Sequence, residues 1–269
     1  MSIEDKYTST KNYFPRPEEW SSMMLFQKIT YTLPLFTEAF APYVDKLEAK
    51  RIAKDMAGDL LDIPQVIRIL KDTDDITKDD MNSQHIIKAT HASGHNIDIV
   101  ANVNYNMHWI KQMLKRFNKS YHLHLNETQY MYVKPRFFIE EKIKCYTNNI
   151  SGNAITFMIY CIYGKPLTVI LTDRNLNRYR HFIINDDYTL EQIAIENQIF
   201  HDFIIPEAKH MNKMFDIAKI LSKPFEFVRV DFYLGADDKI YFSEWTFTPC
   251  AGEQIYSDAL ELSLGKLWV

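Results

Sequence analysis

The sequence predicts an α+β fold, in which helices and strands occur in separate runs rather than in strict alternation. Two observations support this expectation: residues 18–57 have mostly helical spacing, and short apolar runs of strand length dominate the chain after them. With 269 residues, of which 46% are apolar, the chain can bury a sizeable core as one large domain or as two subdomains. No linker rich in Gly, Pro or Ser divides it.

Helices are expected in three places. Residues 18–57 should be mostly helical and should close with a helix over 45–57. The apolar spacing of 107–117 predicts an amphipathic helix. A further helix should begin at Pro206, because proline is favoured in a first turn, and should run to about Ser222.

Strands are expected after the first helical region. Six apolar runs have the length and residue types of strands: 66–70, 85–90, 97–100, 136–143, 154–164 and 166–174. A hairpin over 227–247 follows the last helix. The charged stretch 71–80 between two of the strands is expected to be a solvated surface loop.

Composition excludes several classes of protein. The net charge of −4 and the pI near 6.1 give no basic surface for a nucleic acid. The first residues lack the apolar centre of a signal peptide, and the longest apolar run, Ala154–Tyr163, is shorter than the ~20 residues of a membrane span. Cys145, Cys161 and Cys250 lack metal-ligand spacing, so we expect reduced thiols in a cytoplasmic protein.

The hairpin FVRVDFYLGADDKIYFSEWTF, residues 227–247, carries charges inside an apolar pattern. Because side chains alternate between faces along a strand, Arg229 and Asp231 share the face opposite to Val228 and Val230. A buried carboxylate without a partner is costly. These charges are therefore either solvated on an outer face or held in place for a function.

The turn of this hairpin decides which charges meet. A two-residue turn at Asp237–Asp238 predicts the pairs Ala236–Lys239, Asp231–Glu244 and Arg229–Thr246. A five-residue loop over 234–238 would instead turn Glu244 toward the apolar face. We favour the two-residue turn, because the longer loop would bury a carboxylate among apolar side chains.

In the favoured register Asp231 and Glu244 lie opposite each other, with Cβ atoms roughly 5 Å apart, where like charges repel. A divalent cation between them would make the contact favourable, and Mg²⁺ is commonly held by one or two carboxylates plus phosphates. Arg229 beside them could stabilise negative charge during a transfer. The alternative is a solvent-facing row in which Arg229 pairs with both acids.

Other polar segments have weaker signals. Lys88 leads into the loop HASGHN, which could hold phosphate through backbone N–H groups and the ammonium, or could be a surface turn. Glu140 and Glu141 could bind an adenine edge at a hinge, or could end an exposed strand. Asp72 and Asp74 form an Asp-x-Asp pair that is typical of metal sites in nucleotide-sugar glycosyltransferases. The histidines lack zinc-like spacing, and we expect none to be a ligand, including His91, His95, His122 and His124.

Four segments occur in an order that resembles the TupA-like branch of the ATP-grasp superfamily, named for teichuronopeptide biosynthesis. They are IIKATHASGHNIDIV, KPRFFIEEKI, IYGKPLTVILTDR and FVRVDFYLGADDKIYFSEWTFTP. The likeness extends from about residue 18 to the C-terminus, and its last segment is the most specific. LEAKRIAKDMAG also resembles the Asp-Lys…Val-Arg helix of the family, with Ala49 in place of the acid and Lys54 in place of the arginine.

The resemblance implies an ATP-grasp fold, in which two α+β subdomains enclose Mg-ATP after a mostly helical N-terminal segment. The expected boundaries are 1–60 for that segment, 61–142 for the subdomain with the lid, and 143–269 for the subdomain with the metal site. ATP and Mg²⁺ are the implied cofactors.

The resemblance also implies roles for single residues. The phosphates would meet Lys50 and Lys88, under a lid that contains Ser93 and Gly94. The adenine hinge would comprise Glu140, Glu141 and the backbone through Ile143. The metal carboxylates would be Asp231 and Glu244, with Arg229 near the transferred phosphoryl group, and the substrate-side basic residues would be Arg174 and Arg180.

Three positions depart from the family pattern. Met158 stands where a lysine is usual, and His95 stands where the lid has a second glycine. Thr246 occupies the place of a metal-binding Asn in many ATP-grasp enzymes, although Thr is typical of this branch. These departures bear on activity more than on fold, and the order of the motifs favours the metal interpretation of the hairpin.

The resemblance thus implies an ATP-dependent carboxylate–amine ligase that works through an acyl phosphate and joins an amino acid to a uronic acid of a surface polysaccharide or capsule. Its partners would be ATP, a small or polysaccharide-linked carboxylate and an amine, without nucleic acid. The alternatives are a glycosyltransferase of polysaccharide biosynthesis that uses Asp72 or Asp74, an ATP-grasp kinase, and a non-catalytic ATP-binding protein.

Overall fold

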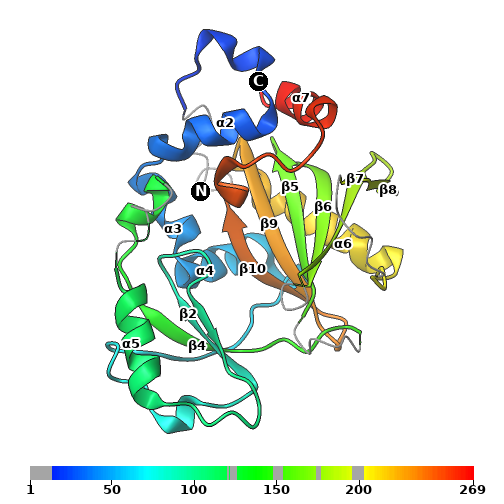
Figure 1. Ribbon diagram of the computed structural model, residues 1–269. Helices are drawn as coiled ribbons and strands as arrows, with labels where there is room; N and C mark the ends of the chain where they lie inside the picture. Colours follow the sequence, from blue (N-terminus) through cyan, green and yellow to red (C-terminus); the bar gives the residue numbers. More distant parts are fainter. Residues whose placement is uncertain (1–13, 120, 122–125, 148–153, 174–176, 196–202) are drawn as a thin grey trace.

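The computed structural model describes residues 14–119, 121, 126–147, 154–173, 177–195 and 203–269. The described chain contains helices and two antiparallel sheets, which confirms the α+β class (Figure 1). Arg174, His122 and His124 lie outside the described residues.

The larger sheet has the strand order β10-β9-β5-β6-β7-β8. Its strands are β5 (Thr156–Ile162), β6 (Lys165–Asp173), β7 (Arg178–Ile184), β8 (Leu190–Ile193), β9 (Phe227–Leu234) and β10 (Ile240–Thr246). The smaller sheet has the order β1-β4-β2-β3. Its strands are β1 (Val66–Ile69), β2 (His85–Ala89), β3 (Asn96–Asp98) and β4 (Phe137–Glu141). Each of the six strand-like runs and the hairpin therefore forms strands, while β7 and β8 were not predicted.

The α-helices are α2 (Leu25–Thr32), α3 (Ala41–Val44), α4 (Lys46–Ala57), α5 (Met107–Phe117), α6 (Ala208–Ser222) and α7 (Asp258–Leu267). Short 3₁₀ helices occur at Glu18–Ser22, Leu33–Leu35, Glu38–Phe40, Gly58–Leu60, Lys78–Asp80, Thr128–Tyr132 (η7) and Pro249–Gly252 (η8). The helix expected over 107–117 is confirmed. The helix expected from Pro206 begins two residues later, at Ala208, and α7 was not predicted.

Local chemistry explains where α4 begins and ends. The carboxylate of Asp45 caps its N-terminus and accepts hydrogen bonds from the backbone N–H groups of Leu47 (3.0 Å) and Glu48 (3.3 Å). Gly58 follows its last residue with a φ of 55°, which favours glycine.

Two apolar cores hold the molecule together. The larger core contains side chains from the N-terminal helices, the larger sheet, α6 and α7, so the helical N-terminal segment packs into the body that carries β5–β10. α6 contacts β5, β6 and β9, and α4 contacts β10. The smaller core lies between α5 and the smaller sheet and includes Ile87, Ile110, Leu114 and Ile139.

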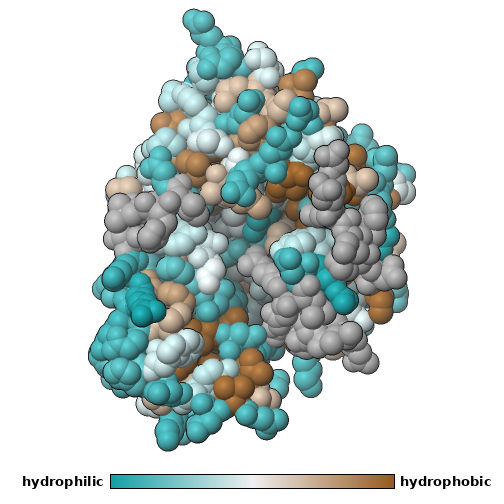
Figure 2. Space-filling model, in the orientation of Figure 1, coloured by the Kyte–Doolittle hydropathy of each residue, from teal (hydrophilic) through white to brown (hydrophobic). Residues whose placement is uncertain are grey.

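The smaller sheet and α5 form a lobe at the lower left of Figure 1, beside the larger body. The surface in Figure 2 is hollowed between this lobe and the body, and hydrophilic side chains cover much of the outer side of the lobe. Among the described residues, no helix combines the length and the apolar character that crossing a membrane would need.

Candidate active site

The hairpin β9–β10 brings the two predicted acids together. Asp231 lies opposite Glu244 on the antiparallel ladder, and Arg229 lies opposite Thr246, as the favoured register predicted. The predicted turn was wrong, however. Gly235 N–H donates to the Lys239 carbonyl (2.9 Å), so the connection is longer than the expected two residues and Ala236 does not pair with Lys239.

A β-bulge corrects the register between the turn and the acids. Phe242 pairs with Phe232 and Glu244 pairs with Asp231, so Ser243 is the extra residue on β10. The bulge turns Ser243 and Glu244 to the same face, where both line a pocket. Strict alternation along the strand would put Phe242 on the face of Glu244 and Ser243 on the other face. The bulge breaks this alternation, so Ser243 lines the pocket and Phe242 is buried.

Arg229 holds the carboxylate of Asp231 by both oxygens. Its Nε donates to Oδ1 and its Nη2 donates to Oδ2, each at 2.7 Å, and Asp231 is fully buried. Nη2 also donates to Thr246 Oγ1 (3.0 Å) and lies 3.7 Å from Glu244 Oε1. Burial opposes the charge on Arg229, but Asp231 outweighs it and raises the arginine pKa above its ordinary value.

The donor set suits a hard divalent cation. Both Asp231 and Glu244 carry carboxylate oxygens. The side chain of Glu244 is 19% exposed and can reach a ligand, whereas Asp231 is buried and would share its oxygens between Arg229 and a cation. Among the described residues no group of three His, Cys, Asp or Glu side chains gathers as a metal site. A cation here would have only these two protein carboxylates, and phosphate oxygens would complete its shell, as Mg²⁺ commonly accepts.

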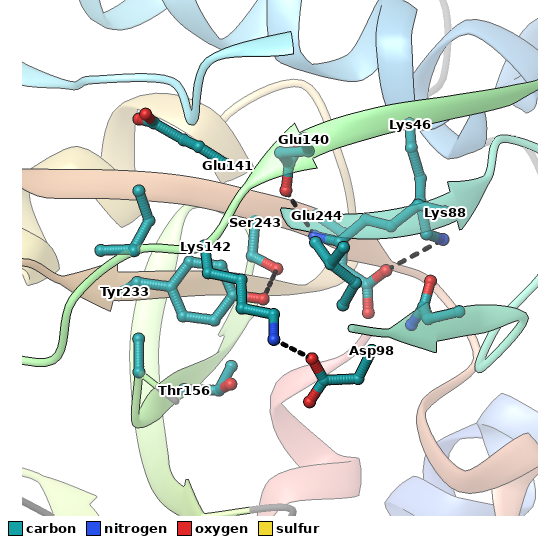
Figure 3. A pocket seen from close by; sticks show the side chains of 14 residues that line it. Lys46, Lys88, Asp98, Glu140, Glu141, Lys142, Thr156, Tyr233, Ser243 and Glu244 are labelled. Atoms are coloured by element: carbon teal, nitrogen blue, oxygen red, sulfur yellow. Dashed lines mark hydrogen bonds and ion pairs between the residues drawn. The ribbon is translucent and has the colours of Figure 1, made fainter. Parts of the chain in front are cut away.

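A pocket of about 240 Å³ opens beside Glu244 (Figure 3). Its walls come from both sheets and from the start of α4, and include Lys46, Lys88, Lys142, Tyr233, Ser243 and Glu244. Lys46 Nζ lies 3.2 Å from Glu244 Oε2 and donates to the Ala92 carbonyl (2.9 Å). Ammonium groups and the carboxylate of Glu244 thus line one cavity, with the buried Asp231 behind Glu244 on the ladder, and this combination suits a metal-bound polyphosphate.

Glu140 is buried between two lysines at the back of the site. Its Oε1 lies 2.6 Å from Lys88 Nζ and its Oε2 lies 2.9 Å from Lys50 Nζ. Burial alone would raise the pKa of Glu140, but the two ammonium groups outweigh it and lower that pKa. The same carboxylate overcomes the effect of burial on Lys88 and raises its pKa, whereas burial dominates at Lys50 and lowers the pKa there.

The lysine that sequence reasoning missed is Lys46. Lys50, the predicted phosphate lysine, is one helical turn further along α4, is 3% exposed and is not among the residues that line the pocket. Lys46 lines it together with Lys88. A signal was present in the sequence, because Asp45–Lys46 contains the family's Asp-Lys dipeptide, whereas the match at Ala49 lacked the acid.

The predicted hinge lies at the junction of two pockets. Glu141 and Ile143 line both the main pocket and a neighbouring one. The Glu141 N–H donates to the Gln65 carbonyl, and Glu140 serves the two lysines described above. The side chain of Glu140 is therefore engaged by protein groups, whereas Glu141 is half-buried beside the cavity.

The predicted lid connects β2 to β3. Gly94 has a φ of 70°, and the loop closes where Ala89 N–H donates to the His95 carbonyl (3.0 Å). Ser93 and Gly94 are exposed. The ring of His95 stacks on Phe117 at the end of α5, with centroids 4.3 Å apart, and His91 Nε2 lies 2.8 Å from the Phe117 carbonyl. Two histidines thus anchor the loop to α5.

Other predicted residues lie elsewhere. Arg180 of β7 pairs with Leu171 of β6, and its side chain lies on the sheet face opposite to Asp231, where it donates to Gln192. The structure therefore does not bring it to the cleft. Met158 lies next to Asp231 on the ladder and is buried. Asp72 accepts hydrogen bonds from its own turn, and Asp74 pairs with Lys115 of α5.

Comparison with solved structures gives similar chains at low identity. The ATP-grasp ligase PsnB complexed with a minimal precursor has 12% identity and a TM-score of 0.39, over 76% of this chain and 52% of that one. Biotin carboxylase from Campylobacter jejuni has 13% identity and a TM-score of 0.48, over 86% and 47%. D-alanine–D-alanine ligase from Bacillus anthracis complexed with ATP has 16% identity and a TM-score of 0.44, over 86% and 64%. This chain therefore spans about half to two thirds of the length of those proteins.

A comparison with curated proteins gave no match. The family model for "TupA-like ATPgrasp" matches residues 33–269, which is most of the chain. This match confirms the expected family and fold. The chain belongs to the TupA-like ATP-grasp family.

Proposed function

We propose that this protein is an ATP-dependent carboxylate–amine ligase. The observation that carries the proposal is the juxtaposition of Asp231 and Glu244, paired across β9–β10 beside Arg229, with a pocket that also presents Lys46 and Lys88. Opposed carboxylates next to ammonium groups that line the same pocket can receive a nucleoside triphosphate with its cation.

Each group has a role that follows from its charge. Lys46 and Lys88 would bind phosphate oxygens as point charges, and the hinge at Glu141–Ile143 would meet the base. Magnesium bound to Asp231 and Glu244 would neutralise the phosphates and orient the transferring group. Arg229 would stabilise the charge that develops on that group once Asp231 shares its oxygens with the cation.

The reaction needs no protein nucleophile. An oxygen of the substrate carboxylate attacks the γ-phosphorus, the bond to ADP breaks, and an acyl phosphate forms. The nitrogen of a neutral amine then attacks the acyl carbon, the carbon–oxygen bond to phosphate breaks, and the nitrogen loses one proton to give the amide. Both steps depend on positioning and on charge neutralisation.

The finer proposal is that the acid is a uronic acid of a surface polysaccharide and the amine is an amino acid. It is supported by the family to which the chain belongs. The test is ADP release in the presence of Mg²⁺, with methyl glycosides of glucuronic and galacturonic acid crossed against the standard L-amino acids. We expect ADP release and a condensed product by mass spectrometry in at least one combination that contains both partners.

The same assay separates the alternatives. A kinase would release ADP with the acid or an alcohol alone and would transfer phosphate to it, and a non-catalytic protein would bind ATP without turnover in any mixture. A glycosyltransferase would depend on Asp72 or Asp74, and those residues are engaged in a turn and with Lys115. No observation favours that function here.

A further inference from the structure

Glu127 is a buried carboxylate near the active site, just before η7, and the donor to its side chain is a hydroxyl group. It is 4% exposed and accepts a hydrogen bond from Thr248 Oγ1, and the hydroxyl of Tyr121 is close enough to influence its pKa. Within the described part of the chain, Glu127 makes no ion pair with a lysine, arginine or histidine. This is unusual, because a buried carboxylate is normally compensated by a cation.

The other acids of the site show the contrast. Asp231 is held by Arg229, Glu140 by Lys50 and Lys88, and Glu244 by Lys46. Although several lysines and an arginine lie in this site, the hydrogen-bond donor to Glu127 is a neutral hydroxyl group. Burial raises its pKa, while the hydrogen bonds from Thr248 and Tyr121 act in the other direction.

A second buried acceptor lies beside it. Gln129 is 1% exposed, and its Nε2 donates to Thr248 Oγ1 (2.9 Å). The single hydroxyl proton of Thr248 goes to Glu127, so Thr248 can only accept from Gln129, and this fixes the orientation of the amide. Gln129 Oε1 is consequently left buried without a hydrogen-bond partner. The amide of Gln129 and the carboxylate of Glu127 thus share one hydroxyl group, and each side chain carries an acceptor oxygen without a cation.

The position of this pair connects it to the catalytic groups. Thr248 is two residues beyond Thr246, which accepts from Arg229. Both Lys46 and Glu244 are close enough to influence the titration of Glu127. Ser93 of the lid and Glu127 both influence the pKa of the Tyr121 hydroxyl, so this hydroxyl lies between the lid and the carboxylate.

We propose that Glu127 and Gln129 Oε1 form the binding site for the ammonium group of the amine substrate. Two acceptors without a counter-cation recognise a group that brings several N–H donors and a positive charge. A primary ammonium supplies both, and it would be repelled by the lysine-lined nucleotide pocket. The inference rests on the proposed ligase function.

The proposed site also explains where the ammonium nitrogen loses its protons during the reaction. The ammonium nitrogen transfers one proton to the Glu127 carboxylate, which becomes a neutral acid, and its lone pair then attacks the acyl phosphate. The second proton leaves the nitrogen with the departing phosphate. Glu127 returns its proton to solvent after release of the amide.

The experiment compares two nucleophiles in one enzyme. Hydroxylamine is uncharged at neutral pH and converts acyl phosphates to hydroxamates, so it needs no ammonium site. The wild type is assayed with Mg-ATP and the glycosides of glucuronic and galacturonic acid, with hydroxylamine in one arm and the L-amino acids in the other. The variants are Glu127→Gln and, as a matched control on the neighbouring loop, the exposed Glu253→Gln.

We expect Glu127→Gln to keep hydroxamate formation near the wild-type rate and to lose on the order of tenfold to a hundredfold in kcat/KM for the amino acid, because a hydrogen bond to a charged group is lost. Glu253→Gln should match the wild type in both arms. An amino-acid kcat/KM that is unchanged in Glu127→Gln overturns the inference while leaving the ligase proposal intact. Loss of both activities also overturns it, because Glu127 would then serve acid activation or folding.

A second variant guards against misfolding. Gln129→Met removes the unpartnered oxygen without touching the carboxylate, and we expect an amino-acid KM raised by about tenfold with the hydroxamate arm preserved. Equal KM values in Gln129→Met and the wild type would count against the site even if Glu127→Gln failed to fold. A wild type that forms no hydroxamate with any acid would remove the ligase proposal, and this inference with it.

Discussion

The pocket has two charged walls that use the same chemistry in different ways. On the β9–β10 wall, Glu244 is partly exposed and lies 3.2 Å from Lys46 Nζ and 3.7 Å from Arg229 Nη2. On the opposite wall, Glu140 is 1% exposed and is clamped between Lys50 and Lys88. The comparison indicates that one wall keeps its charges available to a ligand, while the other fixes its lysines in place.

The first prediction tests the ligand wall and has the largest expected effect. Glu244→Gln and Asp231→Asn should each abolish ATP turnover. Glu244→Gln should leave the fold intact, because Glu244 is partly exposed, whereas Asp231→Asn should also lower the free energy of unfolding, because the buried Arg229 loses its carboxylate partner. ADP release measures turnover, and circular dichroism with thermal unfolding measures the fold. Turnover at the wild-type rate in either variant would refute the assignment of these acids to a cation.

The second prediction tests the structural wall. Glu140→Gln should reduce the free energy of unfolding by about 3–5 kcal/mol, because two buried ammonium groups lose their shared partner. The pKa of Glu140 is lowered in the folded state, so its stabilisation is present above the ordinary Glu pKa and is lost as pH falls through the lowered value. The difference between wild type and variant should therefore shrink in acid.

Urea unfolding at neutral and acidic pH measures this effect, and Glu48→Gln on the exposed side of α4 is a suitable control. A Glu140→Gln variant as stable as the wild type at neutral pH would show that the clamp does not hold the wall together.

The two walls also differ in how much of their residue arrangement could be predicted from the sequence. Strand alternation predicted that Asp231 and Glu244 would meet, and this survived an error in the turn, because the bulge at Ser243 compensates for the longer connection. No residue pattern in a single sequence reliably predicts a β-bulge. The face taken by Ser243 could not be predicted for that reason.

Helical residues were harder to place. Lys46 and Lys50 lie one turn apart on the same side of α4, and only the packing of that helix against β10 and α6 decides which ammonium reaches the pocket. Arg180 shows the same limit in a strand that was not predicted: without knowing β7, its face could not be assigned. The elements themselves were more predictable, since local apolar spacing marks α5 without any tertiary information.

The third prediction sharpens the comparison within a single helix and has the smallest expected effect. Lys46→Met should weaken ATP binding on the order of tenfold to a hundredfold, because a charged contact to phosphate is removed from the pocket wall. Lys50→Met should leave ATP affinity within about threefold and should instead lower thermal stability, because Glu140 keeps Lys88 but loses one ammonium. The two variants carry the same substitution one helical turn apart, so they distinguish a lysine that contacts ATP from one that stabilises the pocket wall. Calorimetric titration with Mg-ATP measures the affinity of each variant. Weaker ATP binding in Lys50→Met than in Lys46→Met would reverse the assignment, and would restore Lys50 as the residue that reaches the phosphates.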